Sequence, residues 1–337
     1  MSSKFKLVYI FNKAFEMVNA KQQKYQKSLM IVLVTVFALI AIGGLVRSTG
    51  SGMGCPDWPK CFGQLIPPTD ISQLPADYKE RYAVANRTIA DFSAVHTWIE
   101  YINRLFGVWT GIAVLILSYF SFSYKSEKPN IFWGSQLALF LVILNGWLGS
   151  KVVATHLSPG IITLHMVLAI LLIFVLQHLK HLTYGVEFIS NNPNVKKYKN
   201  ILWLILIMSF LQVVLGTQVR EQIDHITNNE PNLAKSNWLG RLDYVFYIHR
   251  SFSAALLIGI FYVLRKLVEE FKENALIQKL SMSIALILIA EIAAGVILAY
   301  FSFPAIVQPL HLLLAVFLVS YLYELIVVLS KRELEKA

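Results

Sequence analysis

Apolar residues gather in eight long runs along the 337-residue chain, separated by shorter polar segments. Each run has roughly the 20 residues that an α-helix needs to cross the hydrocarbon core of a bilayer. The runs fall at residues 28–46, 95–121, 131–150, 161–179, 200–219, 246–265, 279–301 and 308–330. Since backbone polar groups must be satisfied internally in lipid, the pattern predicts an all-α integral membrane protein with eight transmembrane helices.

The second half of the chain repeats the first half. Two stretches return at the same spacing: Tyr-Ile-Asn-Arg at 101–104 as Tyr-Ile-His-Arg at 247–250, and Leu-His-Met-Val-Leu-Ala at 164–169 as Leu-His-Leu-Leu-Leu-Ala at 310–315. A repeat of this kind is one structural unit used twice. Because each half has an even number of spans, the repeat predicts two pseudo-symmetric four-helix bundles side by side, in parallel tandem.

The repeat also sets the expected domain organisation. The expected segments are an N-terminal tail (1–27), a first bundle (28–183), an inner linker (184–198), a second bundle (199–331) and a C-terminal tail (332–337). The first outer loop, at 48–93, is longer than its counterpart at 221–245. Extra loop length on one copy of a repeat usually serves a function.

Basic residues predict the orientation in the membrane. Lysine and arginine concentrate in the N-terminal tail, in the connections after the second, fourth and sixth runs, and at the C-terminus. By the positive-inside rule, both termini are expected in the cytoplasm, with the protein in a bacterial inner (plasma) membrane. The net charge of +10 is spread among loops rather than gathered in a patch, so the expected contact is membrane lipid and not nucleic acid. A homo-oligomer is compatible with the sequence.

The chain has two cysteines, Cys55 and Cys61, and both lie in the long outer loop. The outer compartment permits disulfides. Three interpretations stay open: a redox-active or site-shaping disulfide, a staple for the loop, and a thiolate metal site. The sequence contains no Cys-x-x-Cys-His, which excludes covalently attached c-type haem.

Four polar residues lie near the starts of the even-numbered runs: Asn103, His165, His249 and His311. Their equivalent positions predict a similar depth in the outer leaflet, where ionisable groups are costly and are functional candidates by default. Two imidazoles that face each other across a bundle suit bis-histidine haem ligation. The alternative for each histidine is an interhelical hydrogen bond. The first half has lost one imidazole, which predicts a fixed cofactor in the second half and chemistry in the first.

Arginines accompany these positions in both halves: Arg47, Arg104, Arg220 and Arg250. Guanidinium groups pair well with carboxylates, so we expect these side chains to bind haem propionates. The alternative is that they reach toward lipid headgroups.

One carboxylate, Glu100, lies three residues before Asn103, and His96 lies four residues before Glu100. On a helix the three share one face. The second half has no acid at this place, so we interpret Glu100 as a general acid or base, or as a group that stabilises positive charge. The alternatives are an ion pair between Glu100 and Arg104, and a solvated His96.

Two further polar residues lie deep within apolar runs, Asn145 in the third and Glu291 in the seventh. They fall opposite each other in the repeat. Either they make polar contacts between helices, or they handle protons or water.

Taken together, these motifs resemble the haem A synthase family over nearly the whole chain. The resemblance rests on Gly-Gly-Leu-Val-Arg-Ser-Thr-Gly-Ser-Gly at 43–52, Cys-Pro-Asp-Trp-Pro at 55–59, the Glu-x-x-x-Arg motif at 100–104 and the two Leu-His segments. The family oxidises a methyl group of haem O to the formyl group of haem A, through a hydroxymethyl intermediate with oxygen from water. The resemblance therefore implies a haem O synthase upstream and cytochrome oxidase assembly downstream.

The resemblance also implies roles for particular residues. In the second half, His249 and His311 would ligate a resident haem B. In the first half, His165 would ligate the substrate haem, and Glu100 would be the essential acid. The two cysteines of the outer loop match the family's disulfide pair.

The chain departs from the commoner family pattern in two places. Asn103 stands where a histidine is usual, and amide groups are poor iron ligands. We therefore expect substrate haem to be five-coordinate on His165 or to carry a water held by Asn103, with His96 as a further possible ligand. A second cysteine pair found in some members is absent, so a mechanism that needs two disulfides does not apply.

Two other functions compete with this interpretation. A non-catalytic di-haem b-type electron carrier explains the histidines and the repeat, but it explains neither Glu100 nor the lost ligand. A transporter also suits parallel repeats, but no run has a Gly/Pro interruption at mid-membrane.

Overall fold

The computed structural model describes residues 3–85, 87–184, 194–230 and 232–329. Within these residues the secondary structure is helical, apart from turns and two isolated β-bridges. Eight of the described helices are long and apolar enough to cross a membrane. They are α1 (Ser3–Ser48), α3 (Ala94–Ser121), α4 (Pro129–Ala154), α5 (Pro159–Tyr184), α6 (Val195–Asn229), α7 (Tyr244–Glu270), α8 (Ala275–Tyr300) and α9 (Val307–Leu329). Each coincides with one predicted run, which confirms the prediction of an all-α membrane fold.

Local capping fixes where several of these helices begin. The side chain of Ser93 accepts a hydrogen bond from the backbone N–H of His96 at the start of α3. Asp243 and Asn274 cap α7 and α8 in the same way. Such caps satisfy backbone N–H groups that have no partner within the helix.

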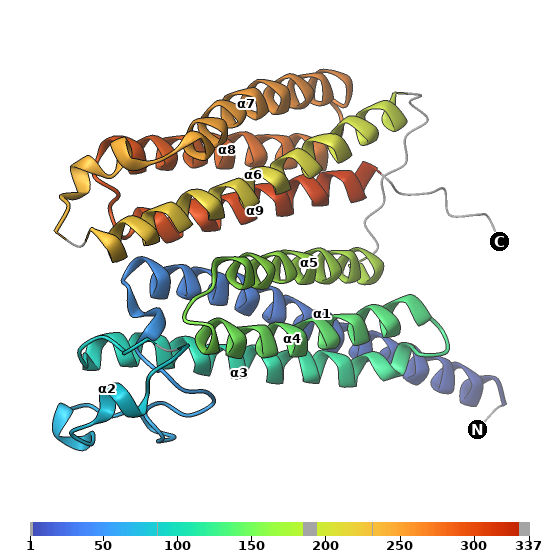
Figure 1. Cartoon of the computed structure of the whole chain (residues 1–337). Helices are drawn as coiled ribbons and strands as arrows, with labels where there is room; N and C mark the ends of the chain where they lie inside the picture. Colours follow the sequence, from blue (N-terminus) through green and yellow to red (C-terminus); the bar gives the residue numbers. More distant parts are fainter. Residues whose placement is uncertain (1–2, 86, 185–193, 231, 330–337) are drawn as a thin grey trace.

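The eight long helices pack as two groups of four. Helices α1, α3, α4 and α5 contact one another around a ring, and α6, α7, α8 and α9 do the same. Figure 1 shows the second group above the first, with the start of α1 and the end of α9 at the same end of the molecule. This grouping agrees with the two expected bundles, while a two-fold relation between them stays a prediction.

Polar contacts join the two groups between α5 and α9. Gln177 donates hydrogen bonds to the backbone oxygen and the hydroxyl of Ser320, at 3.1 and 2.7 Å. Near the end of the same helices, Glu324 lies 2.8 Å from Lys180 Nζ and 3.1 Å from His181 Nε2. Buried polar groups need such partners, so these contacts fix how the two groups meet.

The long first outer loop folds back on α3. It contains two short 3₁₀ helices, Ser51–Met53 and Ile71–Gln73, and one helical turn, α2 (Tyr78–Arg81). Its own small apolar core includes Cys55, Cys61, Phe62, Leu74, Tyr78 and Ile89. The loop is therefore a packed cap at one end of the first group. In Figure 1 it is the segment that contains α2.

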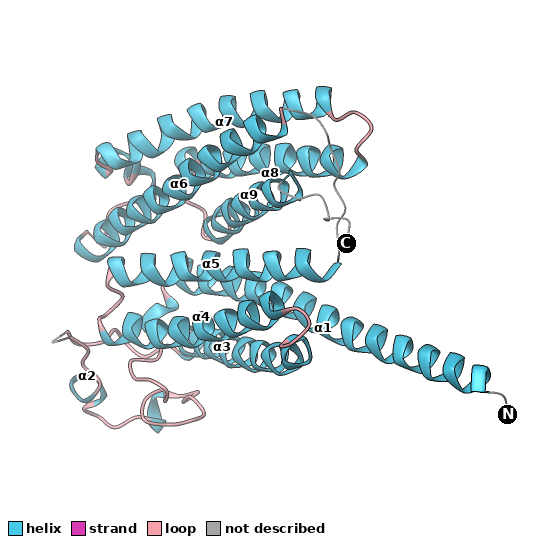
Figure 2. Cartoon of the chain, turned by 90° about the vertical axis from the view of Figure 1, so that its right-hand side faces the viewer, coloured by secondary structure: helices cyan, strands magenta, loops and turns pink. Residues whose placement is uncertain are grey.

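Two helices extend beyond their predicted segments, and two other predicted segments lie partly or wholly outside the described residues. Helix α6 continues to Asn229, into the predicted loop 221–245, because Ile223 and Ile226 remain buried there against Trp238. Helix α1 includes most of the predicted tail 1–27, and its first turns project beyond the other helices in Figure 2. Of the linker 184–198, residues 185–193 lie outside the described residues, as does the whole tail 332–337.

The close approach of α1 to α9 generates a testable prediction about stability. A Cβ added at Gly44 would lie 3.0 Å from Cβ and 3.2 Å from Cα of Pro309. We expect Gly44→Leu to force the two helices apart and to lower the free energy of unfolding by about 1–3 kcal/mol. The measurement is the thermal unfolding midpoint of the detergent-purified protein. Gly107→Leu on α3 is the control, because a Cβ there meets nothing within 4 Å; equal midpoints for the two variants would contradict the prediction.

Candidate functional site

Each of the four predicted ligand positions lies against a glycine of the neighbouring helix. The pairs are Asn103 with Gly43 (3.8 Å), His165 with Gly149 (3.5 Å), His249 with Gly216 (3.3 Å) and His311 with Gly295 (3.4 Å), each distance running from an added Cβ to the nearest ligand side-chain atom. A glycine at each position lets the candidate ligand pack directly against the backbone of the neighbouring helix, in the place that a larger side chain would occupy. The structure shows which candidate ligand each glycine contacts.

In the second group, His249 and His311 face each other. Their ring centroids are 6.4 Å apart and their planes are inclined by 83°. Since an imidazole nitrogen lies about 2 Å from a metal it ligates, two imidazoles on opposite sides of one iron have ring centres about 6 to 6.5 Å apart. The pair therefore fits a bis-histidine haem, with the space beside Gly216 and Gly295 next to the rings.

Both histidines of this pair are held by polar groups one turn inward of the glycines. Gln212 donates to the backbone oxygen of His249 at 2.8 Å. Oε1 of Glu291 lies 3.1 Å from Nδ1 of His311. Among the described residues, neither the buried Nδ1 of His249 nor that of His311 forms an aligned hydrogen bond, so the approach of Glu291 to His311 is a short polar contact. Gln212 was not predicted as a site residue, although its position four residues before Gly216 could have signalled it.

In the first group, Asn145 holds His165. With its amide oriented to satisfy both ends, the nitrogen donates to Nδ1 and to the backbone oxygen of His165, at 3.0 and 2.9 Å, and the oxygen accepts from the backbone N–H of Ala169 at 3.2 Å. The corresponding inward place beside Asn103 is taken by Leu39. Asn103 Oδ1 is buried and has no hydrogen-bond partner among the described residues, so it is available to a water or ligand.

Two of the predicted propionate-binding arginines converge on one acid. Arg47 and Arg220 each lie 2.7 Å from a different carboxylate oxygen of Asp224. Arg47 follows Gly43 by four residues, and Arg220 follows Gly216 by four. Each arginine therefore lies one helical turn nearer the outer end than its glycine. Asp224 was missed from the sequence, although its spacing of four from Arg220 is the signal of a helical ion pair. This cluster bridges α1 and α6 beside both candidate sites.

The other two arginines have different surroundings. Arg250 is exposed, and its guanidinium lies over the rings of Phe246 and Tyr247, at 5.8 and 5.3 Å from their centroids. Arg104 is held by the outer loop: it donates to the backbone oxygens of Cys55, Asp57 and Lys60. That all four arginines bind propionates stays a prediction.

Glu100 links the candidate substrate site to the outer loop. It is 4% exposed, and its Oε1 lies 2.5 Å from Nη2 of Arg104 while its Oε2 accepts from the backbone N–H of Cys55 at 2.8 Å. The ion pair that competed with a catalytic role is therefore formed. His96 lies one turn outward with an exposed side chain, unlike Glu100.

Cys55 and Cys61 form a disulfide, with Cα atoms 4.7 Å apart. The predicted pairing is confirmed, and the thiolate metal site is wrong because both sulfurs are bonded to each other. Within the described ranges, no three or more His, Cys, Asp or Glu residues cluster as metal ligands. A haem site needs fewer protein ligands than such a cluster, because the porphyrin supplies the remaining ones.

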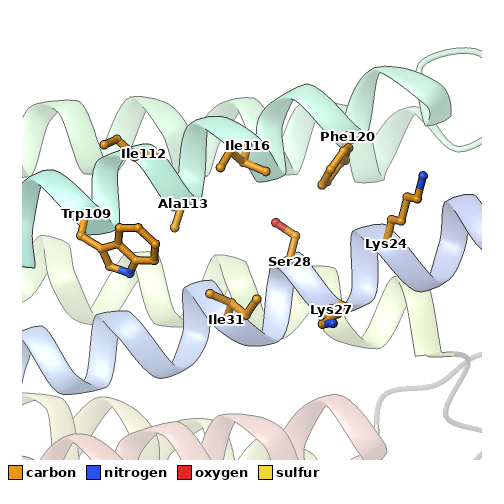
Figure 3. Close-up of a pocket in the computed structure, with 9 residues that line it drawn as sticks. All are labelled: Lys24, Lys27, Ser28, Ile31, Trp109, Ile112, Ala113, Ile116 and Phe120. Atoms are coloured by element: carbon orange, nitrogen blue, oxygen red, sulfur yellow. The ribbon is translucent and has the colours of Figure 1, made fainter.

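An open pocket lies elsewhere, toward the inner ends of α1 and α3. It has a volume of about 280 Å³, with Lys24 and Lys27 near one end and Trp109 at the other. Figure 3 shows mainly apolar side chains between them, including Ile112 and Ile116. None of the candidate ligands lines it, so the haem-site residues and this cavity are separate.

The Arg104 contacts predict that the loop depends on this side chain. Both cysteines are fully buried, so a reductant reaches the disulfide only when the loop opens. Hydrogen bonds to charged groups contribute roughly 1.5–3 kcal/mol each, and we expect Arg104→Ala to speed reduction of Cys55–Cys61 by dithiothreitol about tenfold or more. The measurement is thiol alkylation over time, read as a gel shift. Arg81→Ala, on the exposed face of α2, is the control. An unchanged rate of disulfide reduction in Arg104→Ala would show that Arg104 does not hold the loop closed.

Comparison with known proteins gives consistent matches along the chain. The family model COX15-CtaA, described as cytochrome oxidase assembly protein, matches residues 26–323. A protein of Rickettsia felis named Heme A synthase is 24% identical over 326 residues, which cover 87% of this chain and 94% of the relative. A Heme A synthase of Shewanella oneidensis is 25% identical over 217 residues, covering 64% of this chain and 62% of the relative.

Proposed function

The chain belongs to the COX15-CtaA family of cytochrome oxidase assembly proteins, and from this premise we propose that it is an oxidoreductase that makes haem A from haem O. The reaction converts a methyl group of haem O to the formyl group of haem A through a hydroxymethyl intermediate, with oxygen from water. The named relatives support the overall activity. The second half has two candidate histidine ligands, whereas the first has one histidine and one asparagine. This difference supports a resident haem in the second half and the substrate haem in the first.

The second group is the proposed place of a resident haem B. His249 and His311 would ligate its iron, since their separation of 6.4 Å fits two axial imidazoles. Gly216 and Gly295 leave room beside the rings. When bound, haem B supplies a redox centre through which electrons can leave the substrate.

The first group is the proposed substrate site. It has the same glycine contacts, but its two candidate positions are one imidazole, His165, and one amide, Asn103, whose Oδ1 has no hydrogen-bond partner among the described residues. A site with one strong ligand position suits a haem that must enter and leave. His96, exposed at the start of α3, is the less favoured second ligand.

Glu100 is the proposed catalytic carboxylate. It lies one turn outward of Asn103 on α3, and both of its oxygens already have partners in Arg104 and the Cys55 backbone. An acid held this firmly is preorganised to stabilise positive charge that develops at the substrate. Proton transfer by Glu100 would require one of these two contacts to open. The disulfide loop would thus keep the carboxylate oriented over the site and exclude water.

The arginine cluster is proposed to receive propionates of both haems. Arg47 and Arg220 lie one turn outward of the two glycine spaces and share Asp224. Two guanidinium groups and one carboxylate leave one positive charge, which a propionate would neutralise. Arg250 would serve the resident haem, and Arg104 would act through the loop.

The proposed setting follows from topology and charge. The start of α1 and the end of α9 lie at one end of the molecule, and the lysine-rich connections predict that this end is cytoplasmic, in a bacterial inner membrane. A haem O synthase would supply the substrate, and cytochrome oxidase assembly would consume the product.

The competing function is a di-haem b-type electron carrier. The facing pair of His249 and His311 serves either function equally well. The carrier, however, needs a second bis-histidine site, and Asn103 stands in the first group where the second group has His249. This difference supports the enzyme.

The two functions predict different haem contents. We expect protein purified from cells that make haem O to yield haem B together with haem O, its hydroxylated form or haem A, measured by acid extraction, chromatography and mass detection. Glu100→Gln should keep haem B and the shape of the side chain while lowering haem A formation about 100-fold or more. His311→Ala should lose haem B. Two haem B per chain, with wild-type behaviour of Glu100→Gln, would establish the carrier instead.

A further inference from the structure

The two halves hold their corresponding histidines with chemically opposite groups. Asn145 and Glu291 fall at equivalent positions of the repeat, each on the helix that precedes its histidine. Asn145 lies one turn inward of Gly149, and Glu291 lies one turn inward of Gly295. Glu291 presents a carboxyl oxygen to His311, a group that accepts hydrogen bonds. Asn145 presents an amide N–H to His165, a group that donates a hydrogen bond. The same fold therefore imposes two different hydrogen-bonding states on its ligands.

In the second half, Glu291 Oε1 lies 3.1 Å from His311 Nδ1 without the alignment of a hydrogen bond. A carboxylate this close to Nδ1 favours a proton there, because the negative charge attracts the N–H. The other ring nitrogen, Nε2, then has a free lone pair. A carboxylate that accepts the remote N–H of a metal-ligating histidine fixes the ring orientation and makes the ligand more basic. Glu291 is enclosed between helices, with a side chain 13% exposed, so water competes little for this contact.

In the first half, the backbone of α5 fixes the amide of Asn145. Its oxygen accepts from Ala169 N–H, and its nitrogen faces the carbonyl oxygen of His165 at 2.9 Å. A reversed amide would place two oxygens against each other and two N–H groups against each other. The group that meets Nδ1 of His165, at 3.0 Å, is therefore a donor. A neutral imidazole that accepts at Nδ1 carries its proton on Nε2.

We propose that Glu291 and Asn145 are positioning residues that give the two haem sites unequal affinity. Glu291 leaves Nε2 of His311 ready to ligate a haem that stays. Asn145 favours the proton of His165 on Nε2, so ligation through Nε2 requires that proton to transfer to Nδ1 and the Asn145 N–H to turn away from Nδ1, and the haem is held weakly. The inference rests on the proposed function, in which the first half must release its product.

The first test removes the carboxylate while keeping its shape. In the purified full-length protein, we expect Glu291→Gln to release haem B to apomyoglobin about 10–100-fold faster than wild type. The midpoint potential of the remaining haem B should shift to more positive values, because a neutral amide stabilises the ferric ligand set less. Both quantities are read from haem absorbance and require no turnover.

A matched control is available on the same group of helices. Glu324 on α9 also lies 3.1 Å from a histidine nitrogen, Nε2 of His181, but near the opposite end of α9 from His311. Glu324→Gln removes a carboxylate–imidazole contact of the same length. It should leave the rate of haem B release and the midpoint potential unchanged, even if it lowers the unfolding temperature.

The second test converts the donor in the first half to an acceptor. We expect Asn145→Asp to slow the release of added haem O about tenfold or more, because the carboxylate can accept from Nδ1 and free Nε2. The gain should disappear in the double variant with His165→Ala. A slower release that persists without His165 would show that Asn145→Asp acts by another route and would overturn this half of the proposal.

The outcomes separate this inference from the proposed function. If wild-type protein holds haem B but Glu291→Gln releases it at the wild-type rate and potential, the positioning role is wrong and haem A synthesis stands. If wild-type protein holds no haem B while His249 and His311 are intact, the proposed function fails and takes the inference with it.

Discussion

The approach of a glycine to a ligand side chain on the next helix is the constraint on which the rest of the site depends. Within lipid, the backbone must be helical, so space for a flat ligand cannot come from an open loop. It comes instead from positions without a Cβ, at Gly43, Gly149, Gly216 and Gly295. Interiors are close-packed, so a missing side chain beside an imidazole is the simplest way for two packed helices to leave room for a ring system.

The contacts outward of these glycines tie the two halves to each other. Arg47 from the first half and Arg220 from the second share Asp224, while Gln177 and Ser320 join the halves through α5 and α9. A shift of one half would therefore disturb the outer rim of both sites. The loop adds a second restraint on the first half only, because Arg104 and Glu100 hold its backbone against α3. This restraint gives the first site a rigid carboxylate that the second site lacks.

Much of the fold was accessible from the sequence, and the accessible parts share a physical cause. The apolar runs predicted the helices because span length is a local property. The inaccurate predictions concern where helices begin and end, and some side-chain contacts were not predicted at all. Helix α6 continues beyond its apolar run because Ile223 and Ile226 pack against Trp238, which lies in the segment after the helix. The contacts of Arg104 with backbone oxygens of the loop were not foreseen, because no periodicity of the sequence indicates them.

The sequence by itself determined the eight helices, the repeated motifs and the candidate positions Asn103, His165, His249 and His311, because each depends on residue type and spacing along the chain. Only the tertiary structure decided that Glu291 lies against His311 and Asn145 against His165. It likewise decided that one acid serves two arginines. These contacts depend on how each helix is rotated about its axis against a neighbour, and that rotation is fixed by packing between residues distant in the chain.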